Sequence, residues 1–419
     1  MIKEIKKEDF NSISKTFDNV TFYQTSNWAD LKSYTNWKGL YLAYEKDNQI
    51  KACGLFLLKK MPLLNSYMAY CPRGFLIDYN DKELLTKVNK ELIAYLKNKK
   101  VFELIMDPYV LLNHRDIDGN IIEDGFDNHD VVNQLVSLGY KHTGYNLYYE
   151  NLQPRFLFRL NIKDKTIDEI YKGFKKEAKR RANKKDFFGI NVRELKEDEI
   201  EVFKDLMNKT SIRKGFIDRP LGYYKQMYST LSKDKILRYM VAQIDVDKCR
   251  KNAEAEILKI SKRVEKLMEH EASNAGRIKE EKVTINSNQK IIEQLDILEK
   301  EKGKIVPLSV VCLLTYGKEA IMLLAGNDED YLQHFNTSNI IVAELIKLCK
   351  NEGYDYYNFY GITGNFDPKS ESYGLYTYKK QYGGEVVELI GQFEYQINSL
   401  VKHLYDIMLK AYKLTKKIG

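Results

Sequence analysis

Residues 358–365 read NFYGITGN, and residues 373–384, a few positions later, read YGLYTYKKQYGG. The first stretch ends an apolar, strand-like run in a glycine turn at Gly361. The second is rich in tyrosine and places Lys379 and Lys380 shortly before a glycine pair. Glycine lets a backbone approach a ligand closely, and a lysine ammonium is a compact point charge suited to phosphate. The two stretches together predict an anion-binding turn at the end of a strand.

The turn closes the second of two similar runs of elements. In the first run, strands are expected at residues 40–44, 52–58, 67–70 and 101–106, with an amphipathic helix at 82–97. In the second run, strands are expected at 156–162, 236–244, 307–315, 320–325, 354–359 and 386–390, and helices at 167–185 and 338–350. Each run consists of strands, a helix and a last strand, and the last strand ends in a polar turn. In the first run, Asp107 is the first residue of this turn. This order indicates one α/β (α+β) fold present twice.

A helical pattern between residues 246 and 304 interrupts the second run. Apolar residues recur there at spacings of three and four, charges of both signs cover the remaining faces, and no proline intervenes. With a polar turn at 273–276, the pattern predicts an antiparallel coiled-coil hairpin with arms of about 25 residues. We therefore expect one domain at 1–152, a second at 153–245 and 305–419, and an inserted helical arm at 246–304.

Size and composition narrow the class of protein. A chain of 419 residues with 44% hydrophobic residues can form two or three domains, each with its own core. The net charge of +8 favours anionic partners such as RNA, nucleotide diphosphates or an acidic membrane face. No apolar run reaches the ~20 residues of a membrane span, and the N-terminus lacks an apolar signal core. The five scattered cysteines indicate free thiols and no zinc site, so we expect a cytoplasmic protein.

The order of the quoted residues, the duplicated fold and the hairpin resemble the FemABX family of peptidyltransferases, which build peptidoglycan cross-bridges. The resemblance implies two tandem GNAT-like domains with the hairpin inserted in the second. It also implies an aminoacyl-tRNA donor, a muramyl-pentapeptide acceptor such as lipid II, no cofactor, and peripheral association with the inner membrane face. The GNAT loop Arg/Gln-x-x-Gly-x-Gly/Ala is absent from the sequence, which argues against acetyl-CoA as the donor.

The first stretch that carries the resemblance is a short helix at residues 26–32. Ser26 can cap this helix, and Trp28 and Leu31 share its buried side. Lys32 follows directly and can reach out of this apolar platform. The resemblance implies that Lys32 contacts the diphosphate of the muramyl precursor, whereas a solvated helix lysine is the alternative.

Four more candidates come from other stretches. The resemblance implies that Arg219 pairs with the diphosphate and that the Tyr223 hydroxyl donates a hydrogen bond to the precursor. Arg73 lies in a proline–glycine turn, and its guanidinium suits carboxylate or phosphate, with a solvated turn arginine as the alternative. Tyr331 is a candidate substrate contact, although core packing is the favoured interpretation.

At the reaction centre the resemblance places the charge of Lys379 and the backbone carbonyl of Tyr378, where phenylalanine is commoner in the family. The family reaction is aminolysis, in which a stem-peptide amine attacks the ester that joins an amino acid to tRNA. Positioning of the substrates and stabilisation of the oxyanion then supply most of the catalysis. Either Asp107 or the Tyr378 carbonyl is expected to accept the proton, and a turn-capping aspartate is the alternative for Asp107.

Residues 171–185 form a strongly basic stretch, with eight basic residues and one acidic residue. Its expected anion contacts are Lys175, Lys176, Lys179, Arg180 and Arg181. Acceptor-stem RNA and an anionic membrane face both fit this pattern, and a solvated helix face is the alternative. Two other functions stay open for the whole chain: a non-catalytic RNA- or membrane-binding adaptor, and an acyltransferase that acts on another cell-envelope amine.

Overall fold

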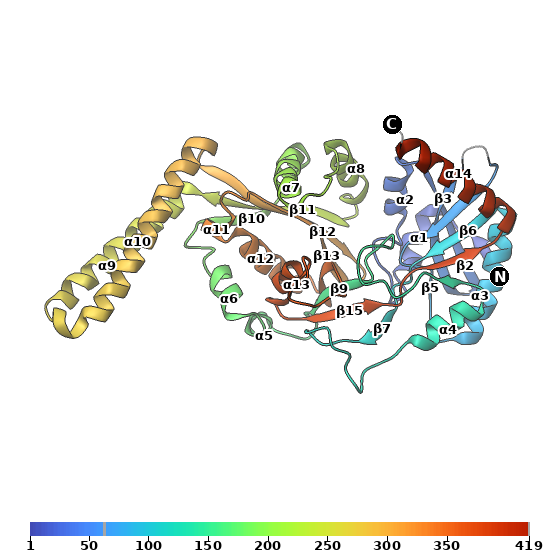
Figure 1. Cartoon of the computed structure of the whole chain (residues 1–419), viewed down its shortest axis with the longest axis horizontal. Coiled ribbons are helices and arrows are strands. Elements are labelled where there is room, and N and C mark those ends of the chain that lie inside the picture. Colours follow the sequence, from blue (N-terminus) through green and yellow to red (C-terminus); the bar gives the residue numbers. More distant parts are fainter. Residues whose placement is uncertain (62–63, 418–419) are drawn as a thin grey trace.

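The chain folds around two mixed sheets covered by helices, and a long helical hairpin extends from one end (Figure 1). The structure is a computed structural model that describes residues 1–61 and 64–417, with side chains described as far as residue 410. Within those ranges, no helix combines the length and the apolar character needed to cross a membrane.

The first sheet is formed mainly by the N-terminal part of the chain. Its strands follow the spatial order β1 (Ile2–Glu4), β2 (Trp37–Lys46), β3 (Gln49–Lys60), β4 (Tyr67–Cys71), β6 (Val101–Met106), β16 (Phe393–Gln396) and β8 (Lys141–His142), and β5 (Leu76–Ile77) pairs with β3. β4 and β6 are parallel, and the other neighbours are antiparallel. Helix α3 (Lys82–Asn98) precedes β6, and α4 (His129–Ser137) precedes β8.

The second sheet repeats this plan. Its strands follow the spatial order β10 (Ile190–Glu194), β11 (Leu237–Asp245), β12 (Ile305–Tyr316), β13 (Glu319–Asn327), β14 (Tyr356–Ile362), β9 (Phe156–Asn161), β15 (Glu385–Leu389) and β7 (Leu111–His114). Here β13 and β14 are the parallel pair, and helices α11 (Leu332–Phe335) and α12 (Thr337–Asn351) lie between them in the chain. A strand pair, a helix and a further strand therefore recur in both sheets, as the sequence predicted. The structure adds that the pair is antiparallel and that the further strand is parallel to its neighbour.

Two strands cross between the sheets. β7, from the N-terminal part, pairs with β15 in the second sheet, whereas β16, near the C-terminus, pairs with β6 and β8 in the first. The expected division at residue 152, with all of 305–419 in one domain, therefore does not follow the sheets. Strand alternation shows that a segment is extended but not which distant edge it joins, so the sequence pattern could not reveal the exchange.

Four helices form an apolar contact between the two halves: α1 (Lys7–Ser14), α2 (Ser26–Ser33), α7 (Ile200–Lys214), which follows the short 3-10 turn Glu197–Glu199, and α8 (Leu221–Leu231). Trp28 and Leu31 of α2 share one buried cluster with Phe203 of α7 and Tyr224 of α8. The predicted burial of Trp28 and Leu31 is thus observed. The helix cap is Thr25 rather than the expected Ser26, because the Thr25 side chain accepts from the backbone N–H of Trp28.

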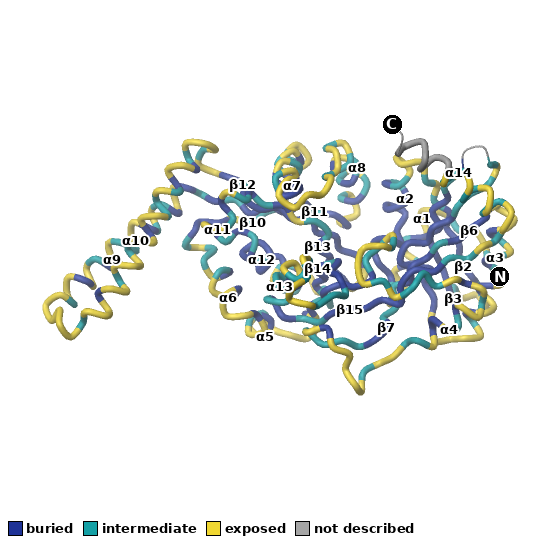
Figure 2. The backbone as a smooth tube through the Cα atoms, viewed as in Figure 1, coloured by how far each residue is buried: buried dark blue, intermediate teal, exposed yellow. Residues whose placement is uncertain are grey.

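The predicted hairpin consists of α9 (Val246–Met268) and α10 (Glu271–Lys302), and it projects from the second sheet with mostly exposed surfaces (Figures 1 and 2). Its arms have 23 and 32 residues, and its turn falls at Glu269–His270. The expected turn at 273–276 is wrong because this segment already belongs to α10. The Asn274 amide donates to the carbonyl of Leu267 at 3.2 Å and to that of His270 at 3.1 Å, which supports an early start of the helix.

The prediction of one continuous basic helix at 167–185 is also wrong. The structure has two shorter helices in this segment, α5 (Ile167–Lys172) and α6 (Lys176–Ala182). At the break, Phe174 is buried and packs edge-to-face against Tyr382, with ring centroids 5.2 Å apart. The backbone N–H of Lys175 donates to the carbonyl of Gln381 at 2.8 Å. This long-range contact replaces an intrahelical bond, and it joins the basic segment to the end of helix α13 (Tyr373–Lys380).

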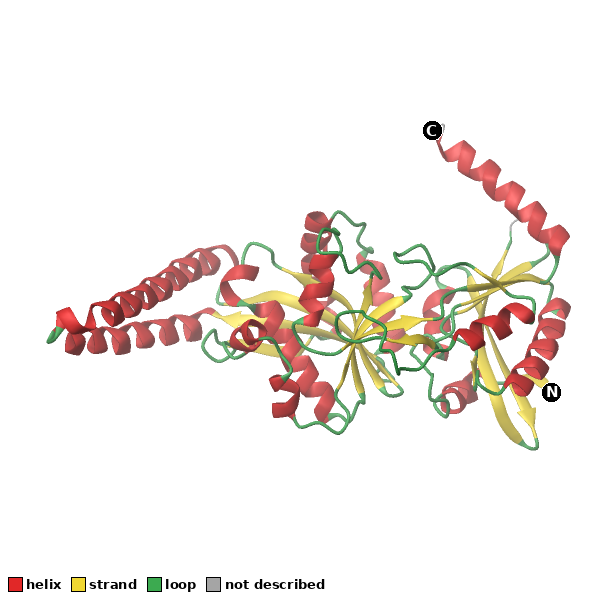
Figure 3. Ribbon diagram, turned by 60° about the horizontal axis from the view of Figure 1, so that its bottom comes forward, coloured by secondary structure: helices red, strands yellow, loops and turns green. Residues whose placement is uncertain are grey.

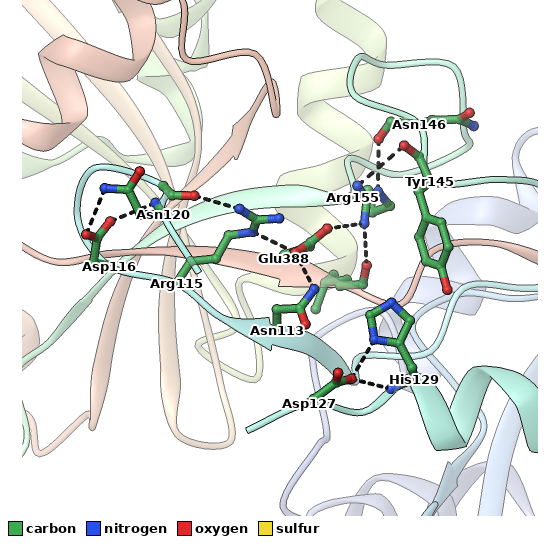
Figure 4. A network of polar contacts seen from close by, with 12 residues as sticks. Asn113, Arg115, Asp116, Asn120, Asp127, His129, Tyr145, Asn146, Arg155 and Glu388 are labelled. Atoms are coloured by element: carbon green, nitrogen blue, oxygen red, sulfur yellow. Dashed lines mark hydrogen bonds and ion pairs between the residues drawn. The ribbon is translucent and has the colours of Figure 1, made fainter. Parts of the chain in front are cut away.

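A buried ion cluster fastens the exchanged strand β7 to the second sheet (Figure 4). Glu388 of β15 accepts from Arg115 Nε at 2.6 Å and from Arg155 Nη1 at 2.7 Å. Asn113 of β7 donates to the same carboxylate at 3.2 Å. Burial alone would raise the pKa of Glu388, but its hydrogen bond to Arg115 and the charge of Arg155 hold the pKa below its ordinary value.

Replacement of Glu388 by alanine is expected to lower the free energy of unfolding by about 3–5 kcal/mol, because the buried guanidinium of Arg155 and the half-buried one of Arg115 lose their carboxylate. Urea unfolding measures the change. Glu83→Ala on α3 is the matched control: Glu83 pairs with Lys87 at the surface, and its loss is expected to cost at most about 0.5 kcal/mol. Similar small losses in both variants would contradict a structural role for the cluster.

Candidate functional site

Lys32 lies in the last turn of α2 with its ammonium 4.4 Å from the ring centroid of Trp28. Burial, together with the nearby charge of Arg219, lowers the pKa of Lys32 to about 8. The guanidinium of Arg219 in turn lies 5.4 Å from the ring centroid of Tyr223 on α8. The contact between α2 and α8 therefore brings together three candidates that were predicted from two separate stretches of sequence.

From Lys32 and Arg219, a series of contacting aromatic side chains leads to Tyr360 of β14. Trp28 packs edge-to-face on Tyr23, with ring centroids 4.8 Å apart. The Tyr23 hydroxyl lies 2.7 Å from that of Tyr360, and both are within hydrogen-bond distance of Gln153 Oε1. Burial raises the pKa of Tyr23 and of Tyr360, so both hydroxyls stay uncharged at neutral pH.

Arg73 and Asp107 form a buried ion pair near Tyr360. Arg73 Nη1 lies 3.5 Å from Asp107 Oδ2, and Asp107 Oδ1 accepts from the Arg73 backbone N–H at 2.9 Å and from the Tyr70 hydroxyl at 3.1 Å. Because Arg73 is only 3% exposed, the alternative of a solvated turn arginine is wrong. Burial raises the pKa of Asp107, although the charge of Arg73 opposes the rise. Asp107 Oδ2 accepts no hydrogen bond from the part of the chain that the structure describes.

Lys379 lies beneath the Gly361 turn. Its side chain is 4% exposed, and Nζ donates to the carbonyl of Gly361 at 2.7 Å and to that of Tyr360 at 3.2 Å. Burial lowers the pKa of Lys379 to about 7, and no carboxylate in residues 1–61 and 64–410 pairs with it. The sequence predicted a lysine presented to an anion, whereas the structure shows a buried amine held by two carbonyls.

Tyr360 connects these two groups of residues. Its φ is +65°, and its backbone N–H donates to Asn358 Oδ1 at 2.8 Å. Its hydroxyl joins Tyr23 and Gln153, while its carbonyl accepts from Lys379. Three of the predicted residues, Lys32, Arg219 and Lys379, thus belong to one row of side chains. Trp28, Tyr23 and Tyr360 connect them.

The side chains of Tyr378 and Tyr331 lie outside the row, whereas the prediction for Tyr378 concerned its backbone carbonyl. The Tyr378 hydroxyl donates to the carbonyl of Ser338 at 3.2 Å, on the side of helix α12. Tyr331 donates to Glu301 at 2.6 Å near the base of the hairpin, and its ring stacks on Phe335. The structure therefore agrees with core packing for Tyr331 and does not bring it into the row.

The basic residues of α6, together with Lys175 directly before it, divide into two sets. Arg180 and Arg181 both bind Glu177, and their hydrogen bonds lower the pKa of that carboxyl to about 2. Lys175, Lys176 and Lys179 are exposed, and they form no ion pair with any residue whose side chain the structure describes. Of the five expected anion contacts, these three lysines are the ones without an ion pair among the described side chains.

Sequence reasoning missed Tyr23, Gln153 and Tyr360, which hold the row together. Tyr23 and Gln153 belong to no motif, and their hydroxyl and amide meet Tyr360 only through the packing of the two halves. Tyr360 lies in the stretch 358–365, directly before Gly361. A residue other than glycine at a tight turn after a strand was the only feature of the sequence that could have indicated its unusual backbone conformation.

The sequence profile of the FemAB family matches residues 5–410. The chain belongs to the FemAB family. Aminoacyltransferase FemA of Staphylococcus aureus strain RF122 is 31% identical over 419 residues, which cover 96% of this chain and 97% of FemA. FemA of strain NCTC 8325 gives the same identity and coverage. The crystal structure of FemX matches with a TM-score of 0.76 at 25% identity, over 96% of this chain and 99% of FemX. The predicted family and the predicted GNAT-like α/β fold are both confirmed.

The buried amine of Lys379 makes the stability of this FemAB protein depend on pH. In the folded chain Lys379 loses its proton near pH 7, whereas an unfolded lysine keeps it until about pH 10. Unfolding between these values takes up a proton, so this group makes the folded state more stable as the pH rises. The free energy of unfolding of the wild type, minus that of Lys379→Met, is expected to increase by about 2 kcal/mol from pH 7 to pH 9.

Urea unfolding of both proteins at the two pH values measures this difference. Because all other groups titrate alike in the wild type and the variant, the subtraction isolates Lys379. A difference that does not change with pH would show that Lys379 keeps its ordinary pKa in the folded chain.

Proposed function

We propose that this FemAB protein is an aminoacyltransferase that moves an amino acid from aminoacyl-tRNA to the stem-peptide amine of a peptidoglycan precursor in cross-bridge formation. The observation that carries the proposal is the continuous row of side chains from Lys32 and Arg219 to Lys379. It provides a cationic end for a diphosphate and a polar end for acyl transfer. The name aminoacyltransferase, which the FemA relatives carry, supports the reaction class.

The cationic end favours an anionic ligand. Lys32 and Arg219 are close enough for one charge to lower the pKa of the other, and neither forms an ion pair with the described side chains. Two like charges without a carboxylate between them are unfavourable until an anion arrives. A diphosphate accepts hydrogen bonds from both, and the adjacent Tyr223 hydroxyl can add a third. We assign lipid II, or its soluble muramyl-pentapeptide counterpart, to this end.

The polar end supplies the groups that aminolysis needs. The stem-peptide amine forms a bond to the ester carbonyl carbon, the bond to the tRNA ribose oxygen breaks, and one proton moves from the amine to an acceptor. Asp107 suits the role of acceptor because burial raises its pKa and Oδ2 has no hydrogen-bond donor in the described chain. Lys379, whose pKa lies near 7, is suited to return a proton to the departing oxygen, and the Tyr378 carbonyl lies beside it in the chain.

Alanine at Lys32 or at Arg219 is expected to reduce kcat/KM for the muramyl precursor by about 10- to 100-fold, because each removes a charge-assisted contact. The assay follows a labelled amino acid from a panel of charged tRNAs to lipid II and to the soluble precursor. Lys87→Ala, which removes an exposed lysine of α3, is the matched control and is expected to leave transfer unchanged.

Two results would contradict the proposal in different ways. If no charged tRNA yields a branched product with the wild type, the chain is a non-catalytic adaptor. If label reaches another envelope amine, and both alanine variants bind the muramyl precursor normally, the reaction is acyl transfer to a different acceptor.

We also propose peripheral association with an anionic membrane surface, through helix α14 (Ser399–Lys417), which extends away from the first sheet (Figure 3). One side of this helix is anchored, since Lys402 pairs with Glu103 at 3.0 Å. Another side exposes Leu400, Leu404 and Ile407, at spacings of four and three. The helix sequence contains five lysines and one aspartate, a pattern typical of helices that lie in a lipid–water interface.

Leu404→Glu is expected to weaken co-sedimentation with phosphatidylglycerol-containing vesicles by about tenfold, because an apolar side chain no longer enters the interface. Leu258→Glu, at a similarly exposed position on α9, is the control and is expected to bind as the wild type does. Equal binding by both variants would argue against α14 as the membrane contact.

A further inference from the structure

The loop at residues 143–154, here called the aromatic loop, presents an unusual concentration of exposed apolar side chains. Between 44% and 55% of the surface of each of five residues is exposed: Tyr145, Leu147, Tyr148, Tyr149 and Leu152. Exposed large apolar side chains are usually scattered singly, and a cluster of them marks a surface that meets a partner. Apart from Gln153, which contacts Tyr23 and Tyr360, the residues of this loop have no role in the reaction described above.

The aromatic loop is held in place by the second sheet. Arg155, itself fixed by Glu388, donates to the carbonyl of Asn146 at 2.9 Å and to that of Tyr145 at 3.5 Å (Figure 4). The backbone N–H of Gly364 donates to the carbonyl of Leu147 at 2.6 Å. Because the backbone is fixed at both points, little conformational entropy is lost when a partner binds the exposed rings.

Two of the exposed rings lie at the turn that holds Lys379. Tyr149 packs against Gly361, where a Cβ atom would lie only 3.3 Å from its Cε1. The Tyr148 hydroxyl accepts from Asn365 Nδ2 at 2.8 Å, four residues further along the turn. The Gly361 carbonyl is the one that Lys379 Nζ contacts at 2.7 Å. A planar group that stacks on Tyr149 would therefore lie next to the proposed reaction centre.

We propose that Tyr149, flanked by Tyr148, is the stacking platform for the terminal adenine of the aminoacyl-tRNA donor. The proposal rests on the proposed function and identifies how the donor is positioned. The base and the ester-bearing ribose belong to the same nucleotide, so a base stacked on Tyr149 brings the ester to the turn of Gly361 and Lys379. Tyrosine rings are suited to this contact because every base has a π face, and stacking is typically the strongest sequence-tolerant contact to an unpaired base.

The position of the basic segment supports a nucleic acid as the occupant. The Lys175 backbone N–H bonds the carbonyl of Gln381, directly after α13, so the exposed lysines of α6 begin at the helix that carries Lys379. Phosphates upstream of the terminal nucleotide can meet Lys175, Lys176 and Lys179 while the last base meets the aromatic loop. A purely apolar partner would form no ionic contacts with these lysines.

The test measures the dissociation constant of an RNA minihelix with a single-stranded 3′ end whose last adenosine carries an amide-linked amino acid. A second RNA lacks only the terminal base. Tyr149→Ala is expected to bind the intact RNA about tenfold more weakly and the abasic RNA as the wild type does. Tyr149→Phe, which keeps the ring, is expected to bind both RNAs normally. Phe126→Ala, which removes an exposed ring stacked on His114, is the matched control and should change neither value.

An equal loss for both RNAs, or no loss for either, would overturn the stacking role of Tyr149. Weaker binding of the muramyl precursor with unchanged RNA binding would overturn it too, and would assign the ring to the acceptor. Transfer and RNA binding by the wild type distinguish these outcomes from failure of the proposed function. If the wild type transfers amino acids and binds the RNA, only the role of Tyr149 is at issue; if it does neither, the proposed function itself is wrong.

Discussion

The backbone of Tyr360 is the constraint on which the candidate site depends. A residue other than glycine with φ near +65° costs ~1–3 kcal/mol, and here the Asn358 side chain fixes this conformation by accepting from the Tyr360 N–H. In this conformation the hydroxyl meets Tyr23 and Gln153 while the carbonyl holds Lys379. One residue therefore connects the first half of the chain to the buried amine of the second.

Two other features fix the positions of the residues that Tyr360 connects. The exchange of β7 and β16 joins each sheet to the opposite part of the chain, and the Glu388 cluster fixes β7 where it enters the second sheet. The apolar contact of α2 with α8 sets the distance between Lys32 and Arg219. Lys32 belongs to α2 and Arg219 lies directly before α8, so this contact holds two like charges near each other. We propose that an anionic substrate supplies the counter-charge.

The spacing of apolar residues along the sequence correctly predicted which segments form helices with one buried side. The spacing of Trp28 and Leu31 predicted the buried side of α2, and the stripe of residues 246–304 predicted the hairpin. The resemblance to a family supplied Lys32 and Arg219, which the structure places together. Long-range contacts decided what the sequence missed: the Lys175–Gln381 bond broke the basic helix, and distant strand pairing exchanged β7 and β16. Burial of Lys379 likewise depends on carbonyls that only the folded turn brings together.

We propose that the row from Lys32 to Lys379 is one acceptor-binding path. A crystal structure with a soluble muramyl-pentapeptide precursor tests it most directly. We expect the diphosphate to lie against Lys32 and Arg219, with the stem peptide passing Trp28 and Tyr23 toward the turn of Gly361. A precursor bound with its diphosphate on the lysines of α6, or anywhere outside this row, would contradict it.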